Sequence, residues 1–256
     1  MNIKEITFSP TGGTQAVSDI IVSSLGDNIV SKFDLTDYKT DFKNINFSNE
    51  DVIVISVPSY GGRVPNLAIE RLKCIQGNGA KCIIVCVYGN RAYEDTLVEL
   101  YDTMVECNFR VIAAISAVAE HSIIHEYAAN RPDEFDKNEL TGFAKAILDK
   151  INTKDVEILP KSKIPGDRPY KQTGKFKMVP KPDKKCVKCG LCAKLCPNQA
   201  IDYTTLIADP NKCISCMRCV AKCPKSARNL NVIMLKLIAL LIKKACLIRK
   251  NNELFI

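Results

Sequence analysis

The feature that most constrains this chain is a cysteine motif that occurs twice in its C-terminal part. Both copies read C-x2-C-x2-C-x3-C-P, and the second begins 27 residues after the first; their cysteines are Cys186, Cys189, Cys192 and Cys196, then Cys213, Cys216, Cys219 and Cys223. A [4Fe–4S] cluster needs four thiolates that converge from different directions, and in this motif the fourth cysteine ligates the cluster of the other copy. The spacing therefore predicts two [4Fe–4S] clusters, and their expected ligands are Cys186, Cys189, Cys192 and Cys223 for one and Cys213, Cys216, Cys219 and Cys196 for the other.

Two other uses of cysteine fit this pattern less well. Zinc sites favour paired C-x2-C hooks that lie well apart and usually include histidine, and neither copy contains a histidine. Disulfides are disfavoured because the 13 cysteines are an odd number and because the N-terminal sequence has neither signal-peptide nor transit-peptide character, from which we expect a reducing, cytoplasmic location. The other five cysteines are expected to be buried apolar residues without a redox role: Cys74, Cys82, Cys86, Cys107 and Cys246.

Residues 183–228 as a whole resemble the bacterial two-cluster ferredoxins, and all eight ligand positions of that family are present. The resemblance implies a small, pseudo-symmetric α+β fold. Such a fold has little apolar core of its own, so the bound clusters stabilise it. Pro197 and Pro224 would turn the chain after each fourth cysteine.

Residues 1–158 alternate short apolar runs with amphipathic stretches. The apolar runs are residues 3–8, 29–35, 51–57, 81–88 and 110–119, and the helical patterns are residues 14–25, 66–74, 93–107 and 132–151. Continuous apolar runs are typical of strands that are covered on both faces. Alternation of strand and helix predicts a parallel, doubly wound α/β sheet with right-handed crossovers. We therefore expect a five-stranded domain over residues 1–158.

A turn rich in hydroxyl groups follows the first predicted strand. Its residues Ser9, Thr11, Gly12, Gly13 and Thr14 lead into the first predicted helix, whose N-terminus carries partial positive charge. A plain strand–helix turn capped by Thr14 is the simpler alternative. Its place beside the switch point of the sheet favours binding, and the chain lacks both the G-x-G-x-x-G and the G-x4-G-K-[S/T] patterns of nucleotide sites. A terminal phosphate monoester, and hence FMN, is the expected ligand.

Two more loops are expected at the same edge of the sheet, because the carboxyl ends of parallel strands meet there. Each offers aromatic rings that could cover a flat ligand and glycines that let the backbone approach it. The candidate FMN residues are Pro58, Ser59, Tyr60, Gly61 and Gly62 after the third strand, and Tyr88, Gly89, Asn90, Arg91 and Tyr93 after the fourth. Tyrosines and glycines are ordinary loop residues, so this prediction depends on three loops lying side by side.

Residues 1–155 resemble the flavodoxins, and S-P-T-G-G-T at residues 9–14 matches that family's FMN phosphate loop. The resemblance implies the strand order 2-1-3-4-5 and a flavin ring between the second and third loops. The chain departs from the family in having no tryptophan, so Tyr60, Tyr93 or another domain must cover the ring, and in having the basic Arg91 where flavodoxins tend to be acidic. The whole chain resembles the flavodoxin–ferredoxin fusion proteins of anaerobic microbes, a resemblance that assigns no defined reaction.

Charge divides the chain into two halves. Residues 1–158 carry a net charge of −8 and residues 159–256 a net charge of +16. Nucleic acid or a membrane often explains such a contrast, but negatively charged clusters would offset part of it. Residues 159–182 are expected to be a basic, proline-rich linker or strap, with too few interleaved aromatic residues to bind nucleic acid.

Residues 229–256 are expected to form an amphipathic C-terminal helix and tail. Two uses of its apolar face remain open. Packing against the rest of the chain, or against a second subunit in a homodimer, is favoured over contact with a membrane surface.

Together these parts predict a low-potential electron-transfer protein that passes electrons between the two clusters, FMN and redox partner proteins. The alternative is an iron–sulfur flavoprotein oxidoreductase in which FMN, supplied with electrons by the clusters, reduces a small substrate or another flavin. His121, in the loop after the fifth strand, is the candidate catalytic proton donor for that alternative. A lone loop histidine is more often a surface residue.

Overall fold

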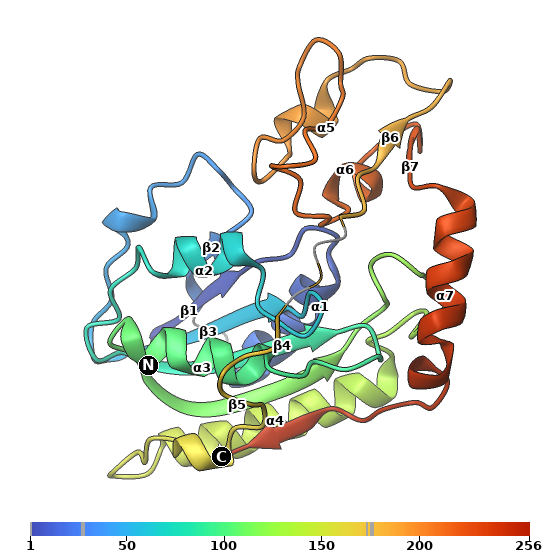
Figure 1. Ribbon diagram of the computed structural model, residues 1–256. Coiled ribbons are helices and arrows are strands. Elements are labelled where there is room, and N and C mark those ends of the chain that lie inside the picture. Colours follow the sequence, from blue (N-terminus) through green and yellow to red (C-terminus); the bar gives the residue numbers. More distant parts are fainter. Residues whose placement is uncertain (1, 27–28, 173, 175–176) are drawn as a thin grey trace.

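The computed structural model describes residues 2–26, 29–172, 174 and 177–256. Its first part contains a parallel sheet in the order β2-β1-β3-β4-β5 (Figure 1). The strands are β1 (Asn2–Thr7), β2 (Ile29–Asp34), β3 (Asp51–Pro58), β4 (Lys81–Tyr88) and β5 (Arg110–Val118). This is the flavodoxin-like, doubly wound order. The predicted fold class is therefore confirmed, and the five strands lie close to their predicted bounds.

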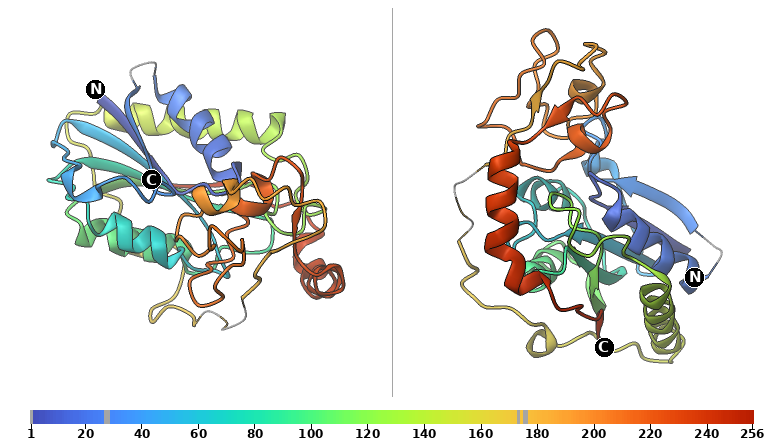
Figure 2. Two further views of the ribbon diagram at one scale, coloured as in Figure 1. Left: turned by 90° about the horizontal axis from the view of Figure 1, so that it is seen from above. Right: turned by 90° about the vertical axis from the view of Figure 1, so that its right-hand side faces the viewer.

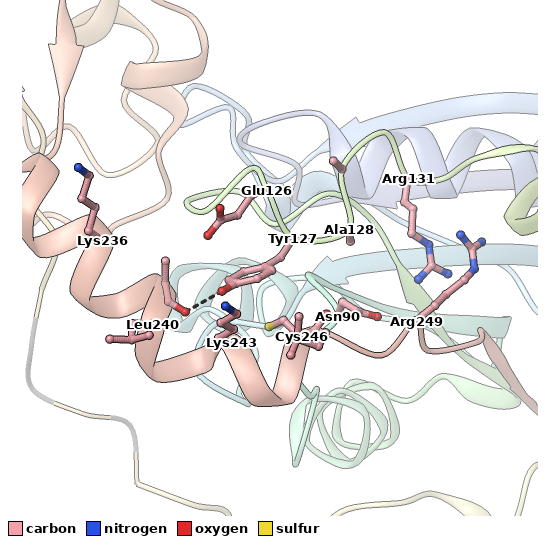
Figure 3. A pocket seen from close by; sticks show the side chains of 13 residues that line it. Asn90, Glu126, Tyr127, Ala128, Arg131, Lys236, Leu240, Lys243, Cys246 and Arg249 are labelled. Atoms are coloured by element: carbon pink, nitrogen blue, oxygen red, sulfur yellow. Dashed lines mark hydrogen bonds between the residues drawn. The ribbon is translucent and has the colours of Figure 1, made fainter.

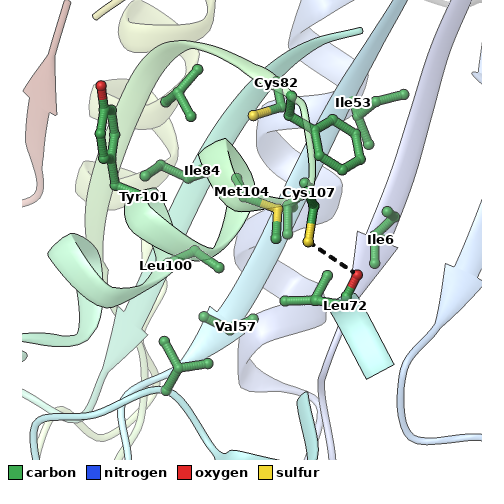
Figure 4. Close-up of a cluster of buried hydrophobic side chains, with 14 of the residues drawn as sticks. Ile6, Ile53, Val57, Leu72, Cys82, Ile84, Leu100, Tyr101, Met104 and Cys107 are labelled. Atoms are coloured by element: carbon green, nitrogen blue, oxygen red, sulfur yellow. Dashed lines mark hydrogen bonds between the residues drawn. The ribbon is translucent and has the colours of Figure 1, made fainter. Parts of the chain in front are cut away.

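Helices cover both faces of this sheet (Figure 2). They are α1 (Gly13–Leu25), α2 (Asn66–Leu72), α3 (Thr96–Glu106) and α4 (Glu134–Ile151); the 3-10 turns are η1 (Phe42–Asn44) and η2 (Lys161–Lys163). Side chains alternate along a strand, so β3 contributes to two cores. Ile53 (Figure 4) and Ile55 pack with α2 and α3, whereas Val52 and Val54 pack with α1 and α4. Burial on both faces explains why the apolar runs in the sequence are continuous.

A sixth strand, β8 (Glu253–Phe255), lies antiparallel to β5 at the edge of this sheet. It was not predicted, because three residues after a helical tail carry no strand pattern. Polar contacts hold it: the Val118 N–H donates to Asn252 Oδ1 (2.9 Å), and Ser116 Oγ donates to Glu253 Oε2 (2.7 Å). The C-terminal end of the chain therefore returns to the first part.

The second part is small and repeats its backbone as well as its sequence. It contains the strands β6 (Lys181–Pro182) and β7 (Arg228–Asn229) and the short helices α5 (Leu191–Lys194) and α6 (Arg218–Ala221). Left-handed residues occur in pairs that are 27 positions apart: Lys188 and Ser215, Gly190 and Met217, and Gln199 and Ser226. Its small core is formed by Ala193, Ile201, Leu206 and Ala208. This is the pseudo-symmetric α+β fold that the ferredoxin resemblance implied.

The predicted linker runs as a strap along the first part. Leu159 is buried in the core beside α3, and its backbone N–H bonds to a carbonyl of β5 (2.8 Å). Further on, Arg168 and Tyr170 both bond to the Asp102 carboxylate of α3 (2.5–2.7 Å). Part of this linker lies outside the described residues. Burial and ion pairing together hold the strap against the first part. The sequence had indicated only that this segment is basic.

Helix α7 (Val232–Cys246) connects the second part to β8 and runs beside the loop after β5 (Figures 1 and 3). Its inner face packs there: Tyr127 Oη donates to the Ala239 carbonyl (2.7 Å), and Ile124 and Cys246 are buried beside that tyrosine. Its outer face is between 58% and 82% exposed at Val232, Ile233, Leu237, Leu240 and Leu241. Over the residues that the structure describes, no helix combines the length and the apolar character needed to cross a membrane.

Candidate functional site

The first predicted cluster site is a cavity whose wall carries the four expected cysteines, Cys186, Cys189, Cys192 and Cys223. All the residues that line it lie within 186–228, and most of the others are apolar or small. The cysteines surround a space and not a point: among the described residues, no three His, Cys, Asp or Glu side chains are placed to hold a single metal ion. A [4Fe–4S] cluster needs such a wider cage, because each thiolate binds a different iron atom.

The second predicted set, Cys196, Cys213, Cys216 and Cys219, also comes together. Burial, together with the neighbouring thiols of this set, raises the pKa of Cys216 to about 12. Burial likewise raises the pKa of Cys219 to about 11. Such thiols stay protonated and unreactive at neutral pH unless a metal ion displaces the proton. The all-sulfur donor set suits iron–sulfur clusters.

The fourth cysteine of each copy accepts a backbone hydrogen bond in the same way. The Ala200 N–H donates to Cys196 Sγ (3.2 Å), and the Ala227 N–H donates to Cys223 Sγ (3.3 Å). Hydrogen bonds to cluster sulfurs stabilise negative charge on them. The residues of both sites therefore fit [4Fe–4S] clusters.

The predicted phosphate loop lies between β1 and α1. Gly12 is left-handed (φ 106°) and precedes α1, which begins at Gly13. Ser9 Oγ accepts a backbone N–H of the first helical turn (2.9 Å), while Thr14 is buried and Thr11 half-buried. No acidic residue lies in the first turn of α1, so nothing on that turn repels an anion. The loop therefore suits a phosphate group.

The second loop turns tightly at Gly61 and Gly62, which are both left-handed. The Tyr60 N–H donates to the Arg63 carbonyl across this turn (2.9 Å). Gly62 touches the third loop, since an added Cβ would come within 1.9 Å of Glu94 Oε2. Only glycine fits there. The other two predicted residues of this loop lie at and just after the end of β3: Pro58 and Ser59.

The C-terminal tail binds part of the third loop. Asn90 is buried, and its side-chain amide donates to the carbonyls of Cys246 and Ile248 (2.8 and 2.9 Å). Tyr93 Oη donates to Glu253 Oε2 (2.7 Å). These two polar side chains, which were predicted to contact FMN, thus form hydrogen bonds to the C-terminal tail instead.

The remaining predicted residues of the third loop are arranged around Tyr93. Tyr88 is buried and packs against it with ring centroids 5.2 Å apart. Arg91 forms a two-bonded ion pair with Glu94 (2.9 and 3.2 Å). The positive charge that Arg91 would bring to a flavin is therefore balanced by a neighbouring carboxylate.

His121 lies against Gly89 of the third loop, where an added Cβ would come within 2.7 Å of the imidazole. Its Nδ1 accepts from the backbone N–H groups of Ile123 and Ile124 (3.2 and 3.1 Å). Burial lowers the pKa of His121 to about 4. The imidazole is therefore neutral at pH 7, and its role as a proton donor stays a prediction.

The two parts of the chain meet at the loop edge of the sheet (Figure 1). Arg71 of α2 donates to the Pro197 carbonyl, which directly follows the fourth cysteine of the first copy (2.7 Å). Arg218 of α6 donates to the Ser9 carbonyl of the phosphate loop (3.5 Å) and lies 3.8 Å from the Asp34 carboxylate. The second part therefore sits directly beside the predicted flavin loops.

One cysteine set lies nearer to these loops than the other. Ile214 packs against the core of the first part. Burial, with Cys216 nearby, raises the pKa of the Tyr60 hydroxyl well above its usual range. We call the cysteines that accompany Cys216 the near set: Cys196, Cys213, Cys216 and Cys219. The far set consists of the cysteines whose cavity is lined by residues of the second part alone: Cys186, Cys189, Cys192 and Cys223.

Two arginines of the second copy were missed. Arg218 contacts the phosphate loop, and Arg228 is buried beside the far-set cavity. The repeat itself carries a signal for both, because the residues 27 positions earlier are the apolar Leu191 and Ile201. Comparing the two copies in register would have singled them out.

Comparison with known proteins separates the same two parts. Residues 185–227 match the family model described as a 4Fe-4S dicluster domain. A search of curated protein sequences found no match. A structure of a flavodoxin from the domain Archaea covers 60% of this chain and 100% of its own, with 14% identity and a TM-score of 0.43.

Two further flavodoxin structures align with the same part of the chain. Oxidised Flavodoxin 1 from Bacillus cereus covers 60% of this chain and 100% of its own, with 14% identity and a TM-score of 0.43. Two-electron reduced Megasphaera elsdenii flavodoxin covers 56% and 98%, with 16% identity and a TM-score of 0.40.

The strand order of the first part and the match of the second define the class of protein. The chain joins a flavodoxin-like, doubly wound domain to a segment of the 4Fe-4S dicluster type. The dicluster match favours iron–sulfur chemistry in the second part.

Proposed function

We propose that this protein passes electrons at low potential between two [4Fe–4S] clusters and FMN. The contact between the two parts supports the proposal, because Arg218 contacts the predicted phosphate loop and Ile214 packs against the core of the first part. When bound, the clusters supply one-electron transfer at low potential and FMN supplies transfer of one or two electrons. The protein chain would determine the positions of the clusters and FMN relative to one another.

We infer that the two cysteine sets lie in series between an external partner and the first part. The near set lies by Tyr60 of the second loop. The far set surrounds a cavity to which no residue of the first part contributes. We therefore expect the near set to serve exchange with FMN and the far set to serve exchange with an external partner protein.

Arg218 favours a flavin that carries a phosphate. Its Nη1 bonds to the Ser9 carbonyl, while its buried Nε has no hydrogen-bond partner. A charge-assisted bond to a phosphate in the loop would contribute about 1.5–3 kcal/mol, or roughly tenfold to a hundredfold in binding. In a fluorescence titration, Arg218→Ala should weaken FMN binding by such a factor and leave riboflavin binding unchanged. An equal loss for both ligands would place Arg218 away from the phosphate.

Rapid mixing tests the proposed electron path. When anaerobic protein is mixed with dithionite, flavin reduction should be faster in the intact chain than in a Cys213→Ser, Cys216→Ser double variant, which lacks two near-set ligands. Cys74→Ser removes a thiol that lies outside both sets and is the matched control; it should behave like the intact chain. Equal rates in the intact chain and the double variant would show that no path runs through the near set.

A further inference from the structure

Arg228 of β7 is a buried cation without an acidic partner. Its side chain is only 2% exposed. Nη1 donates to the Leu206 carbonyl (2.8 Å) and Nη2 to the Pro180 carbonyl (3.0 Å), while the buried Nε has no partner. No Asp or Glu of the described residues forms an ion pair with it. A buried charge that only neutral groups contact is costly, so a negative partner is expected.

The guanidinium lies between the two cysteine sets. Its Nη1 is 3.6 Å from Cys192 Sγ of the far set, and the residue also lines the far-set cavity. On its other side, the Leu206 carbonyl to which Nη1 donates belongs to the small core against which Cys196 and Cys219 of the near set pack. One positive charge therefore faces both predicted clusters.

The internal repeat shows that the backbone does not need an arginine at this position. The equivalent residue 27 positions earlier is Ile201, which is also buried. Ile201 forms an antiparallel bridge with Ala208, as Arg228 pairs with Pro182. An apolar side chain thus satisfies the same backbone environment in the first copy. The cation is a departure from the repeat that packing alone does not explain.

We propose that Arg228 is the shared counter-charge of both clusters and raises the reduction potential of each. This inference rests on the proposed function, in which both cysteine sets hold clusters. Reduction adds one electron, and so one negative charge, to a cluster. A fixed cation in a buried, weakly screening environment favours the more negative form.

Midpoint potentials test this directly. Dithionite titration of anaerobic protein, followed by electron paramagnetic resonance, should give lower potentials for both clusters in Arg228→Met than in the wild type. We expect at least a tenfold change in each reduction equilibrium, which is about 59 mV for one electron. Arg228→Lys keeps the charge and should retain most of the wild-type potential. Lys194→Gln removes an exposed charge of the same segment, and its effect should be smaller because solvent screens it.

The other possible outcomes also support or overturn the counter-charge role of Arg228. Unchanged potentials in Arg228→Met, or a shift no larger than that of Lys194→Gln, would overturn the proposal. If Arg228→Met fails to assemble clusters while Arg228→Lys assembles them, the requirement is for the charge, as proposed. Failure of both would show a requirement for the guanidinium shape and would contradict the counter-charge role. Wild-type protein without iron would instead contradict the proposed function, before any variant is compared.

Discussion

The two parts of this protein are stabilised by different means. The first part buries apolar side chains on both faces of its sheet, and burial of that extent can stabilise a domain alone. The second part has a core of Ala193, Ile201, Leu206 and Ala208, which is too little to offset the conformational entropy that its chain loses on folding. We therefore expect the folding of the second part to depend on what it binds, whereas that of the first part does not.

Two buried arginines show the same contrast at the level of single residues. Arg131 of the first part bonds to the Asp136 carboxylate through both Nε (2.8 Å) and Nη2. Asn252 of the tail also donates to that carboxylate (3.1 Å). Arg228 of the second part has carbonyls and a thiol around it instead. The first part neutralises its own buried charge, and the second leaves one to be neutralised by a ligand.

Removal of iron should have the largest effect on this comparison. Oxidation with ferricyanide in the presence of EDTA should unfold residues 183–228 and leave the first part folded, because metal binding and folding are coupled in such small units. Hydrogen exchange read by peptide should show lost protection in residues 183–228 and unchanged protection in β3 and β4. Protection of residues 183–228 that survives complete loss of iron would contradict the difference drawn between the two parts.

Loss of the Asp136 carboxylate should be the next largest effect. Asp136→Asn would leave Arg131 buried and unpaired, and should lower the free energy of unfolding of the first part by about 3–5 kcal/mol in urea denaturation. The matched control is Lys137→Ala, which breaks an exposed pair with Glu134 on the same helix (2.5 Å) and should cost about 1 kcal/mol or less. Iron content should stay at the wild-type level in both variants. Equal, small losses would show that the first part tolerates an unpaired buried charge.

The smallest expected effect concerns pH. His121 has its pKa lowered by burial from the usual 6.5 to about 4. Below pH 6.5 the unfolded chain therefore binds a proton that the folded chain refuses, and stability is lost as the pH falls from about 6.5 towards 4. In urea denaturation at several pH values, His121→Gln should remove this part of the slope. His125→Gln, which removes the exposed histidine, should keep this part of the slope; the opposite result would contradict the lowered pKa of His121.

Local patterns in the sequence were enough to predict the first fold, and they also singled out eight cysteines as candidate ligands, which stay a prediction. Continuous apolar runs determine buried strands, and cluster ligands follow a fixed local spacing. Contacts between distant segments could not be predicted in this way. Arg218 reaches Ser9 across 209 positions, and Asn90 and Tyr93 are engaged by a tail whose strand is only three residues long. Such contacts depend on how the folded helices, strands and loops pack against one another, and the apolar pattern of the sequence does not predict them.

The proposed function depends on cofactors that eight thiolates would hold beside the predicted flavin loops. Anaerobic purification of the full chain, followed by iron, sulfide and flavin analysis with a visible spectrum, measures this directly. We expect brown protein with about eight iron atoms, about eight sulfides and about one FMN per chain. Colourless protein, or protein that carries zinc and no flavin, would contradict it.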